Sequence, residues 1–309
     1  MPGVIAGADV GGSKADVAIV LPDQPMLRRT VPTAEWYRRA LPGVAAGLAE
    51  TLRDLAGGVA IDVFVVGAHG CDDRDQGARL AADIADQVGI STYVVNDAEL
   101  VLPAADVSSG IGLIIGTGSI AVGYGAQDAV VAVGGWGGYL GDEGSGTGLF
   151  RDAARAVTRA WDRGQRDDPL RAVLMDLLGL RDLRDLPARL TTELGPTAWS
   201  ALTPPLFERA LALGSPLAEA VIERSAAALA ELIVVAGEQG ADDRTVVATG
   251  GLINNAAWFR SALEAAFARE CPQTDLRYLE IAPVHGALKL AEHAVRGDGA
   301  SPLPVALRR

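Results

Sequence analysis

The apolar residues of the chain fall into short runs separated by glycine-rich turns, and one such arrangement occurs twice. Residues 4–22, VIAGADVGGSKADVAIVLP, predict an apolar strand, a tight turn and a second strand. Residues 110–125, GIGLIIGTGSIAVGYG, follow the same order. Each passage continues into a further extended stretch, at 26–31 and 129–133, and then into a segment compatible with a long helix. The pattern predicts a duplicated α/β unit.

The rest of the chain alternates helical periodicity with short apolar runs. We expect helices at 35–56, 74–88, 144–161, 256–270 and 284–295, and strands at 61–70, 91–98, 245–251 and 276–281. Residues 167–238 should form several helices divided by Pro169, Pro187, Pro196, Pro204, Pro205 and Pro216. The tail from residue 297 is rich in Gly and Pro and is expected to fray. This alternation favours an α/β fold with largely parallel central sheets, whose ligands bind beyond the carboxyl ends of strands.

Length and charge narrow the classes of function. A chain of 309 residues exceeds the usual size of one hydrophobic core, so we expect two domains. The net charge of −12 disfavours binding to a nucleic-acid backbone. No apolar run reaches the roughly 20 residues that span a bilayer, and the N-terminus lacks a signal-peptide pattern. Cys71 and Cys271 are far apart and form no CxxC pair, so we predict a cytoplasmic protein with two free thiols. From the charge and the short apolar runs we predict no nucleic-acid or membrane partner.

The first glycine-rich turn, DVGGSK at residues 9–14, has the composition of a phosphate-binding loop. Gly11 and Gly12 allow backbone N–H groups to approach the oxygens of a ligand. Ser13 adds a hydroxyl and Lys14 a positive charge, while Asp9 can hold a water molecule of a bound Mg²⁺. The alternative is a plain β-hairpin, because two glycines after an Asp are common.

Two further turns have the same character. GTGS at residues 116–119 offers a second backbone cradle with the hydroxyls of Thr117 and Ser119, and the two hairpins together could clamp a triphosphate. ATGG at residues 248–251 ends a predicted strand, and its small residues leave room for a nucleotide base or ribose. An ordinary turn is the alternative in both places.

Carboxylates follow two of the predicted elements. Asp97 ends the strand TYVVN, where its carboxylate could accept the proton of a substrate hydroxyl during phosphoryl transfer. The alternative is that Asp97 caps a helix starting at Ala98. In GWGGYLGDEGSGTG, residues 135–148, Asp142 could accept hydrogen bonds from sugar hydroxyls and Trp136 could pack on a ring face. A mobile loop with solvated acids is the alternative there. His69, His285 and His293 lack metal-ligand spacing and are expected to be structural.

In the order DVGGSK, NDA, GTGS, GGWGGYLGDEGSG and ATGGL, these motifs resemble the superfamily of sugar kinases, heat-shock ATPases and actin. The chain is most similar to the BadF/BadG/BcrA/BcrD ATPase family, and within it to the N-acetylglucosamine kinase branch. The resemblance spans about residues 4–295. It implies two RNase H-like domains of the actin-like ATPase type, which close over a cleft that holds ATP and Mg²⁺. We accordingly expect domains at 1–106 and 107–283, with a helical insertion at about 167–238, a closing helix at 284–296 that packs on the first domain, and a tail at 297–309.

The resemblance also implies roles for individual residues. Asp97 corresponds to the catalytic base. The phosphate motifs correspond to Asp9, Gly11, Gly12 and Ser13 and to Gly116, Thr117 and Gly118; the adenosine motif corresponds to Gly250 and Gly251; and the sugar-contacting positions correspond to Asp142, Gly118 and Ser145. These assignments imply an ATP-dependent kinase that acts on a hydroxyl, the 6-hydroxyl by expectation, of an amino sugar such as N-acetylglucosamine or glucosamine. A homodimer is the expected assembly.

One departure from the family concerns the sugar. The N-acetylglucosamine kinases carry an Asn in the loop after the third strand, whereas this chain reads TVPTAEWYRR at residues 30–39. Thr33 or Glu35 could take its place, and an acid there would favour an amino sugar over its N-acetyl form. Other hexoses or N-acetylmuramic acid remain alternative substrates. Further alternatives are an ATPase that activates a dehydratase through an iron–sulfur cluster, and a sugar-sensing regulator or filament-forming ATPase.

Overall fold

The computed structural model describes residues 3–37, 40–71 and 73–296, and it contains two sheets with one topology. The first has the strand order β3-β2-β1-β4-β5 and the second β8-β7-β6-β9-β10. In each sheet the first three strands are antiparallel neighbours. The fourth strand pairs in parallel with the central strand, and the fifth pairs in parallel with the fourth. This repetition confirms the predicted duplication. The strands are β1 Ile5–Val10, β2 Lys14–Val20, β3 Leu27–Pro32, β4 Val63–Ala68, β5 Ser91–Val95, β6 Ile111–Ile115, β7 Ser119–Tyr124, β8 Val130–Gly134, β9 Thr245–Thr249 and β10 Asp275–Tyr278.

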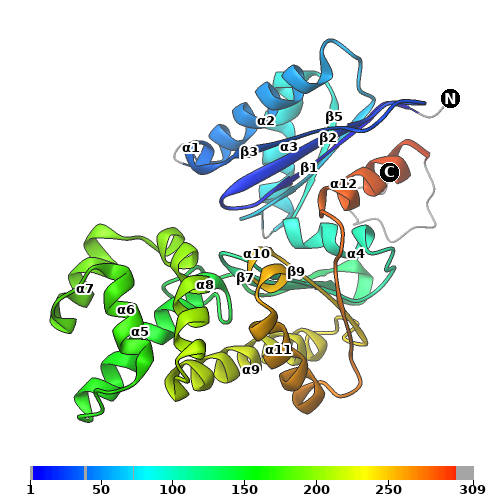
Figure 1. The fold of residues 1–309 in the computed structure, drawn as a ribbon. Coiled ribbons are helices and arrows are strands. Elements are labelled where there is room, and N and C mark those ends of the chain that lie inside the picture. Colours follow the sequence, from blue (N-terminus) through cyan, green and yellow to red (C-terminus); the bar gives the residue numbers. More distant parts are fainter. Residues whose placement is uncertain (1–2, 38–39, 72, 297–309) are drawn as a thin grey trace.

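The first sheet lies in the upper half of Figure 1. Helices cover both of its faces. Alternate residues of β1 point to opposite sides. Ala6 and Ala8 belong to the cluster formed with α2 and α3, whereas Ile5 belongs to the cluster formed with α12. The helices of this half are α1 Ala34–Tyr37, α2 Ala40–Ala56, α3 Arg74–Val88, the 3₁₀ turn η1 Asp97–Leu100 and α4 Val101–Ala104. α3 matches its predicted bounds because Asp73 caps its start and Gly89 ends it in the left-handed region.

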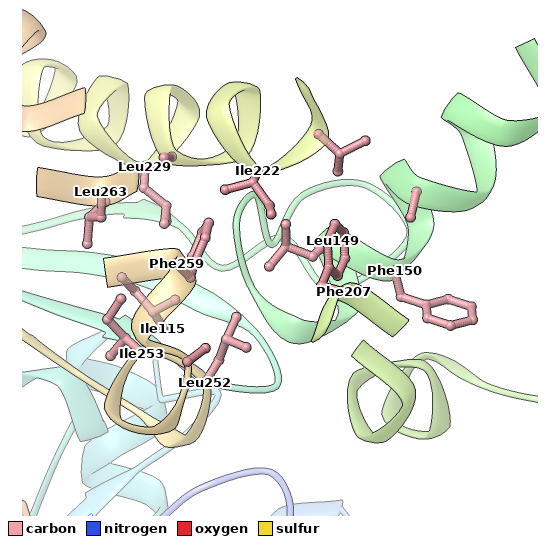
Figure 2. Packing of buried hydrophobic residues seen from close by; sticks show 14 of the residues in the cluster. Ile115, Leu149, Phe150, Phe207, Ile222, Leu229, Leu252, Ile253, Phe259 and Leu263 are labelled. Carbon is pink, nitrogen blue, oxygen red and sulfur yellow. The ribbon is translucent and has the colours of Figure 1, made fainter. Parts of the chain in front are cut away.

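The second sheet packs on a larger set of helices. Figure 2 shows Leu149 from α5 and Phe207 from α8 gathered with residues from α9, α10 and α11 in one apolar cluster. The elements are η2 Ala126–Asp128, α5 Gly146–Asp162, α6 Pro169–Leu178, η3 Leu183–Asp185, α7 Leu186–Ala188, the π-helical turn η4 Arg189–Glu193, α8 Pro196–Ala212, α9 Pro216–Glu238, α10 Gly251–Asn255 and α11 Ala257–Glu270. In Figure 1, α6, α7 and α8 lie to one side of this sheet.

The proline pair Pro204-Pro205 does not divide two helices as predicted, because both residues lie inside α8. Thr203 donates its hydroxyl to the Trp199 carbonyl one turn earlier and to the Gly146 carbonyl. Phe207, on the next turn, is fully buried in the core of this half. Tertiary packing therefore overrides the low helical propensity of proline here.

The last helix, α12 (Val284–Arg296), returns to the first sheet, as the family resemblance implies. Its close approach depends on glycine at two positions. A methyl group on Gly286 would lie 2.0 Å from the Leu100 carbonyl oxygen, and one on Gly7 of β1 would lie 3.0 Å from the Ala287 side chain. α12 consequently contacts β1 and α4 together, between the two sheets in Figure 1.

The two cysteines lie in separate hydrophobic clusters, Cys71 in the first half and Cys271 in the second, and both are buried. Within the described ranges, no helix is both long and apolar enough to cross a lipid bilayer. The expected tail at 297–309 lies outside the described residues.

Candidate active site

The hairpin between β1 and β2 presents its tip to solvent while its base is fixed. The Gly11 amide donates to the Lys14 carbonyl at 3.0 Å, and Gly12, Ser13 and Lys14 are exposed. Thr33, the residue after β3, fixes the hairpin. Its hydroxyl donates to the Gly11 carbonyl at 3.0 Å and its amide to the Ser13 carbonyl at 3.2 Å. The exposed backbone of the tip can therefore meet a ligand on a rigid support.

Thr33 is fully buried, so its side chain supports the hairpin. It cannot replace the family's sugar-contacting Asn, and that expectation for Thr33 is wrong. The side chain of Glu35, the other polar residue expected there, is exposed at the start of α1.

Asp9 lies at the centre of a cluster of carboxylates. It is directly opposite Asp16 in the β1–β2 ladder, and it interacts electrostatically with Asp97. Burial raises the pKa of Asp9 to about 7, aided by the charges of Asp97 and Asp16, while Lys14 and Arg28 act in the opposite direction. Asp16 differs, because hydrogen bonds from Thr30 and Arg28 outweigh the effect of its burial and lower its pKa. The positive charges of Lys14 and Arg28 therefore do not offset the effects of burial and of the neighbouring carboxylates on Asp9.

Asp97 follows β5 and opens the short helix η1. The helix is capped by Asn96, whose side chain accepts from the Ala98 amide at 2.9 Å, so the predicted capping role belongs mainly to Asn96. Asp97 Oδ1 also accepts from the Ala98 amide, at 3.1 Å. Glu99 completes a capping box by accepting from the Asn96 amide at 2.8 Å. The buried Asp97 carboxylate is thereby held by its own turn, next to Asp9.

Glu99 also connects this turn to both halves of the molecule. It forms a bidentate ion pair with Arg74 of α3 at 3.1 and 2.9 Å, and it accepts the hydroxyl of Tyr124 at the end of β7. Burial, and then the charge of Glu99, raise the pKa of Tyr124 well above its ordinary value. The Tyr124 hydroxyl therefore stays protonated and remains a donor. This network fixes the position of Asp97 between the two halves of the molecule.

The second hairpin is joined to the glycine loop rather than standing free. The Gly116 amide donates to the Gly118 carbonyl at 2.9 Å and closes the turn. The amides of Gly146 and Thr147, at the start of α5, donate to the carbonyls of Gly116 and Thr117 at 2.8 and 3.1 Å. These bonds hold the turn while leaving residues 116–118 partly accessible.

The turn at residues 250 and 251 lies directly beside this second hairpin. Gly250 has φ of 132°, and a methyl group there would lie 2.3 Å from the Ile115 carbonyl oxygen. Gly251 opens α10, and its amide nitrogen lies 3.7 Å from where a Gly116 side chain would begin. The two predicted nucleotide motifs of the second half are therefore adjacent, and glycine at 250 is needed for their contact.

Asp142 is held against the second hairpin by the glycine-rich stretch. Its backbone is left-handed, with φ of 58°, which is unusual for a residue other than glycine. Its Oδ1 accepts from the Ser119 amide at 3.3 Å, and both of its carboxylate oxygens lie 3.0 Å from a position that a Gly118 side chain would occupy. Burial raises the pKa of Asp142, while the Ser119 amide and the charge of His69 oppose that shift.

The other two residues predicted to contact the sugar have different settings. Ser145 is fully buried, and its hydroxyl caps α5 by accepting from the Gly148 amide at 3.0 Å. Trp136 is 75% exposed, so its ring face is open to a ligand. Its loop is held by Arg151, which donates to the carbonyls of Gly138 and Gly141.

His69 is a candidate site residue that the sequence analysis classed as structural. It follows β4, its amide donates to the Val10 carbonyl at 2.8 Å, and its Cδ2 lies 3.8 Å from where a Gly12 side chain would begin. Its charge also acts on Asp142 of the other half. His69 thus lies beside the first hairpin and acts electrostatically on the glycine-rich loop that carries Asp142. The available signal was its place directly after a buried parallel strand.

The structure therefore brings together Asp9, Asp97, the two hairpins and Asp142 where the two halves meet. In the part of the chain that the structure describes, no group of three or more His, Cys, Asp or Glu side chains forms a metal cluster. Two neighbouring carboxylates, Asp9 and Asp97, do match the one or two that Mg²⁺ commonly takes beside water and phosphate oxygens.

Two known proteins resemble the chain in sequence. An N-acetyl-D-glucosamine kinase of Dictyostelium discoideum is 26% identical over 93% of this chain and 97% of its own length. An N-acetylmuramic acid/N-acetylglucosamine kinase of Clostridium acetobutylicum is 30% identical, and the match covers 59% of this chain and 62% of that kinase.

Solved structures agree in fold. A Chromobacterium violaceum protein, provisionally described as an N-acetylglucosamine kinase, has a TM-score of 0.71 at 22% identity over 93% of this chain and 98% of its own. A Streptomyces griseus glucokinase of the ROK family, solved with glucose and AMPPNP, has a TM-score of 0.61 at 17% identity over 96% of this chain and 100% of its own. The predicted actin-like ATPase fold is confirmed. The sequence pattern of one family matches residues 6–291, and the chain belongs to this family, the BadF/BadG/BcrA/BcrD ATPase family.

Proposed function

We propose that this protein is an ATP-dependent kinase that transfers the γ-phosphoryl group to the 6-hydroxyl of an amino sugar such as N-acetylglucosamine or glucosamine. The observation that carries the proposal is the position of the Asp97 carboxylate. It is buried and fixed by the capping box and the Glu99 network, and its charge acts on Asp9, at the end of β1 before the first hairpin. The kinase names of the two curated relatives support the same reaction class.

The chain supplies positioning and charge for the transfer. Asp97 accepts the proton of the sugar hydroxyl as that oxygen attacks phosphorus. The exposed amides of the first hairpin, with Ser13 and Lys14, bind phosphate oxygens from one side. The second hairpin, from Gly116 to Gly118, binds them from the other side.

Two further groups complete the nucleotide site. Gly250 and Gly251 lie beside the second hairpin and receive the adenosine. Asp9, and Asp97 beside it, would hold Mg²⁺ through water, and the ion would neutralise phosphate charge. A bound cation would also compensate the negative charge that raises the pKa of Asp9.

The sugar is recognised by the glycine-rich loop. Asp142 lies against Gly118 and accepts hydrogen bonds from sugar hydroxyls, while the open face of Trp136 packs against the pyranose ring. Because Thr33 is buried, Glu35 is the remaining candidate in the segment that carries the family's Asn. A carboxylate there would favour the free amine of glucosamine over the N-acetyl group.

The proposal is tested by a coupled assay of ADP release with glucosamine, N-acetylglucosamine, N-acetylmuramic acid, glucose and mannosamine. We expect release that requires an amino sugar, and a loss of roughly 100-fold or more in kcat for Asp97→Ala. Asp86→Ala, an exposed change on α3, is the matched control and should leave kcat unaltered. Full activity of Asp97→Ala would remove Asp97 from the mechanism, and ADP release independent of every sugar would refute the kinase.

An ATPase that activates a dehydratase is the second candidate from the sequence. That role requires cysteine ligands for an iron–sulfur cluster. Cys71 and Cys271 are buried in different hydrophobic clusters, a setting that disfavours the role. A purified protein with stoichiometric iron and a brown colour would revive it.

We also propose that the protein acts in the cytoplasm and that it forms a homodimer. Sedimentation equilibrium of the purified chain would test the homodimer.

A further inference from the structure

A cavity of about 470 Å³ lies in the second half of the molecule, between α5 and α9. No residue of the two phosphate hairpins or of the glycine-rich loop lines it. Its walls carry four exposed arginines: Arg155 and Arg159 from α5, Arg163 at the C-cap of α5, and Arg224 from α9. Asp152 is the acidic residue among them. This concentration of positive charge occurs in a chain whose net charge is −12.

Arg155, Arg159 and Arg163 are spaced four residues apart, and this spacing destabilises an isolated helix. Residues four apart lie on one helical face, where like charges repel. Asp152 is shared, because it lies 3.1 Å from Arg151 and 3.8 Å from Arg155. Among the residues that the structure describes, Arg159, Arg163 and Arg224 form no ion pair. An anion in the cavity would compensate these charges.

The chemistry of the walls indicates which anion fits. Guanidinium groups match the geometry of phosphate oxygens and bind them bidentately. Gln165 adds a polar side chain, and the buried Ser225 adds a hydroxyl. Leu217 and Ala156 form an apolar part of the wall, which an inorganic ion would leave unused. The volume falls within the roughly 300–1,000 Å³ of small-molecule sites.

We infer that this cavity binds a small organic phosphate ester, at a site separate from the proposed nucleotide and sugar sites. Its phosphate contacts Arg159, Arg163 and Arg224, and its organic part lies against Leu217 and Ala156.

The position of the cavity connects it to the glycine-rich loop. α5 begins at the Ser145 cap, and its 17 residues span about 25 Å. On α9, the Ser225 carbonyl oxygen lies 2.9 Å from where a Gly144 side chain would begin. A ligand that draws α5 and α9 together therefore acts on two supports of the loop that carries Asp142. If the proposed kinase activity holds, the ligand should change the KM for the sugar.

The test is isothermal titration calorimetry of the full chain with glucose 6-phosphate, AMP and inorganic phosphate. We expect glucose 6-phosphate or AMP to bind, and binding to weaken at least 10-fold in the double variant Arg159→Gln/Arg224→Gln. The control is Arg181→Gln/Arg184→Gln, which removes two exposed arginines on the same half outside the cavity. Comparing the titrations with glucose 6-phosphate and AMP shows whether the site prefers a sugar phosphate or a nucleoside monophosphate.

Several results would overturn the inference. These are no binding of either ester, binding of inorganic phosphate alone, or equal binding to wild type and the cavity variant. Sedimentation equilibrium provides a further check: a dimer that dissociates in the cavity variant but not in the control would assign the arginines to an interface instead. Calorimetry measures binding directly, so a failed sugar-kinase assay leaves this test intact.

Discussion

Replacing Asp9 with Asn should stabilise the protein in the absence of metal and nucleotide, although it should abolish activity. Burial and the neighbouring charges of Asp97 and Asp16 raise the pKa of Asp9 to about 7, from an ordinary value of 3.8. The folded protein therefore retains a proton that the unfolded chain releases. Because the folded state binds more protons, the free energy of unfolding falls as pH rises between about 4 and 7. Asn carries no such charge.

The magnitude follows from the size of the shift. Each pKa unit corresponds to about 1.4 kcal/mol, so a pKa raised from 3.8 to about 7 sets an upper limit of about 4 kcal/mol above pH 7. Asp9 is only half-buried as a residue, and screening by solvent reduces this value. We expect Asp9→Asn to raise the free energy of unfolding by about 2–3 kcal/mol at about pH 8, and by less than about 1 kcal/mol at about pH 4.

Urea unfolding in EDTA, without nucleotide, measures both values. Asp16→Asn is the matched control on the facing strand, because hydrogen bonds from Thr30 and Arg28 outweigh its burial and lower its pKa. That change should destabilise the protein. Adding Mg²⁺ and ATP should stabilise wild type more than Asp9→Asn. A variant no more stable than wild type at about pH 8, or a gain of the same size at both pH values, would refute the reasoning.

Three other substitutions test the supports of the site. Glu99→Ala leaves Arg74, which is 34% exposed at its side chain, without its partner; we expect a loss of about 2 kcal/mol in urea unfolding, together with a lower kcat. Gly250→Ala places a methyl group against the Ile115 carbonyl and should lower stability by roughly 3 kcal/mol and raise the KM for ATP. Arg151→Ala removes two hydrogen bonds to the glycine-rich loop, and steady-state kinetics should show a KM for the sugar raised about 10-fold. Unchanged kinetics would show that the loop needs no such support.

Local patterns were sufficient to predict much of the fold. The duplication was visible because each half starts with two apolar strands around a glycine turn, and the two sheets have the same strand order. The bounds of α3 were predictable because a capping Asp and a terminal glycine flank it. The short helix α10 was missed, since its five residues follow a glycine turn and carry no periodicity. Pro204 and Pro205 gave a clear local signal for a helix break, and that prediction was wrong because tertiary packing decides their conformation.

The site was less predictable, because its side chains acquire their roles from partners that are distant in sequence. Thr33 resembled a substrate-binding residue until the β2–β3 pairing placed its hydroxyl under the Gly11 carbonyl. His69 resembled an isolated core residue, yet the parallel pairing of β1 with β4 places it beside Gly12. The parallel strands β1, β4 and β5 are followed by the first hairpin, His69 and Asp97, so the first two positions after each parallel strand deserve equal scrutiny whatever their residue type. That rule would have selected His69 together with Asp97. The position of a residue in the sheet is therefore a better guide to this site than its resemblance to a motif.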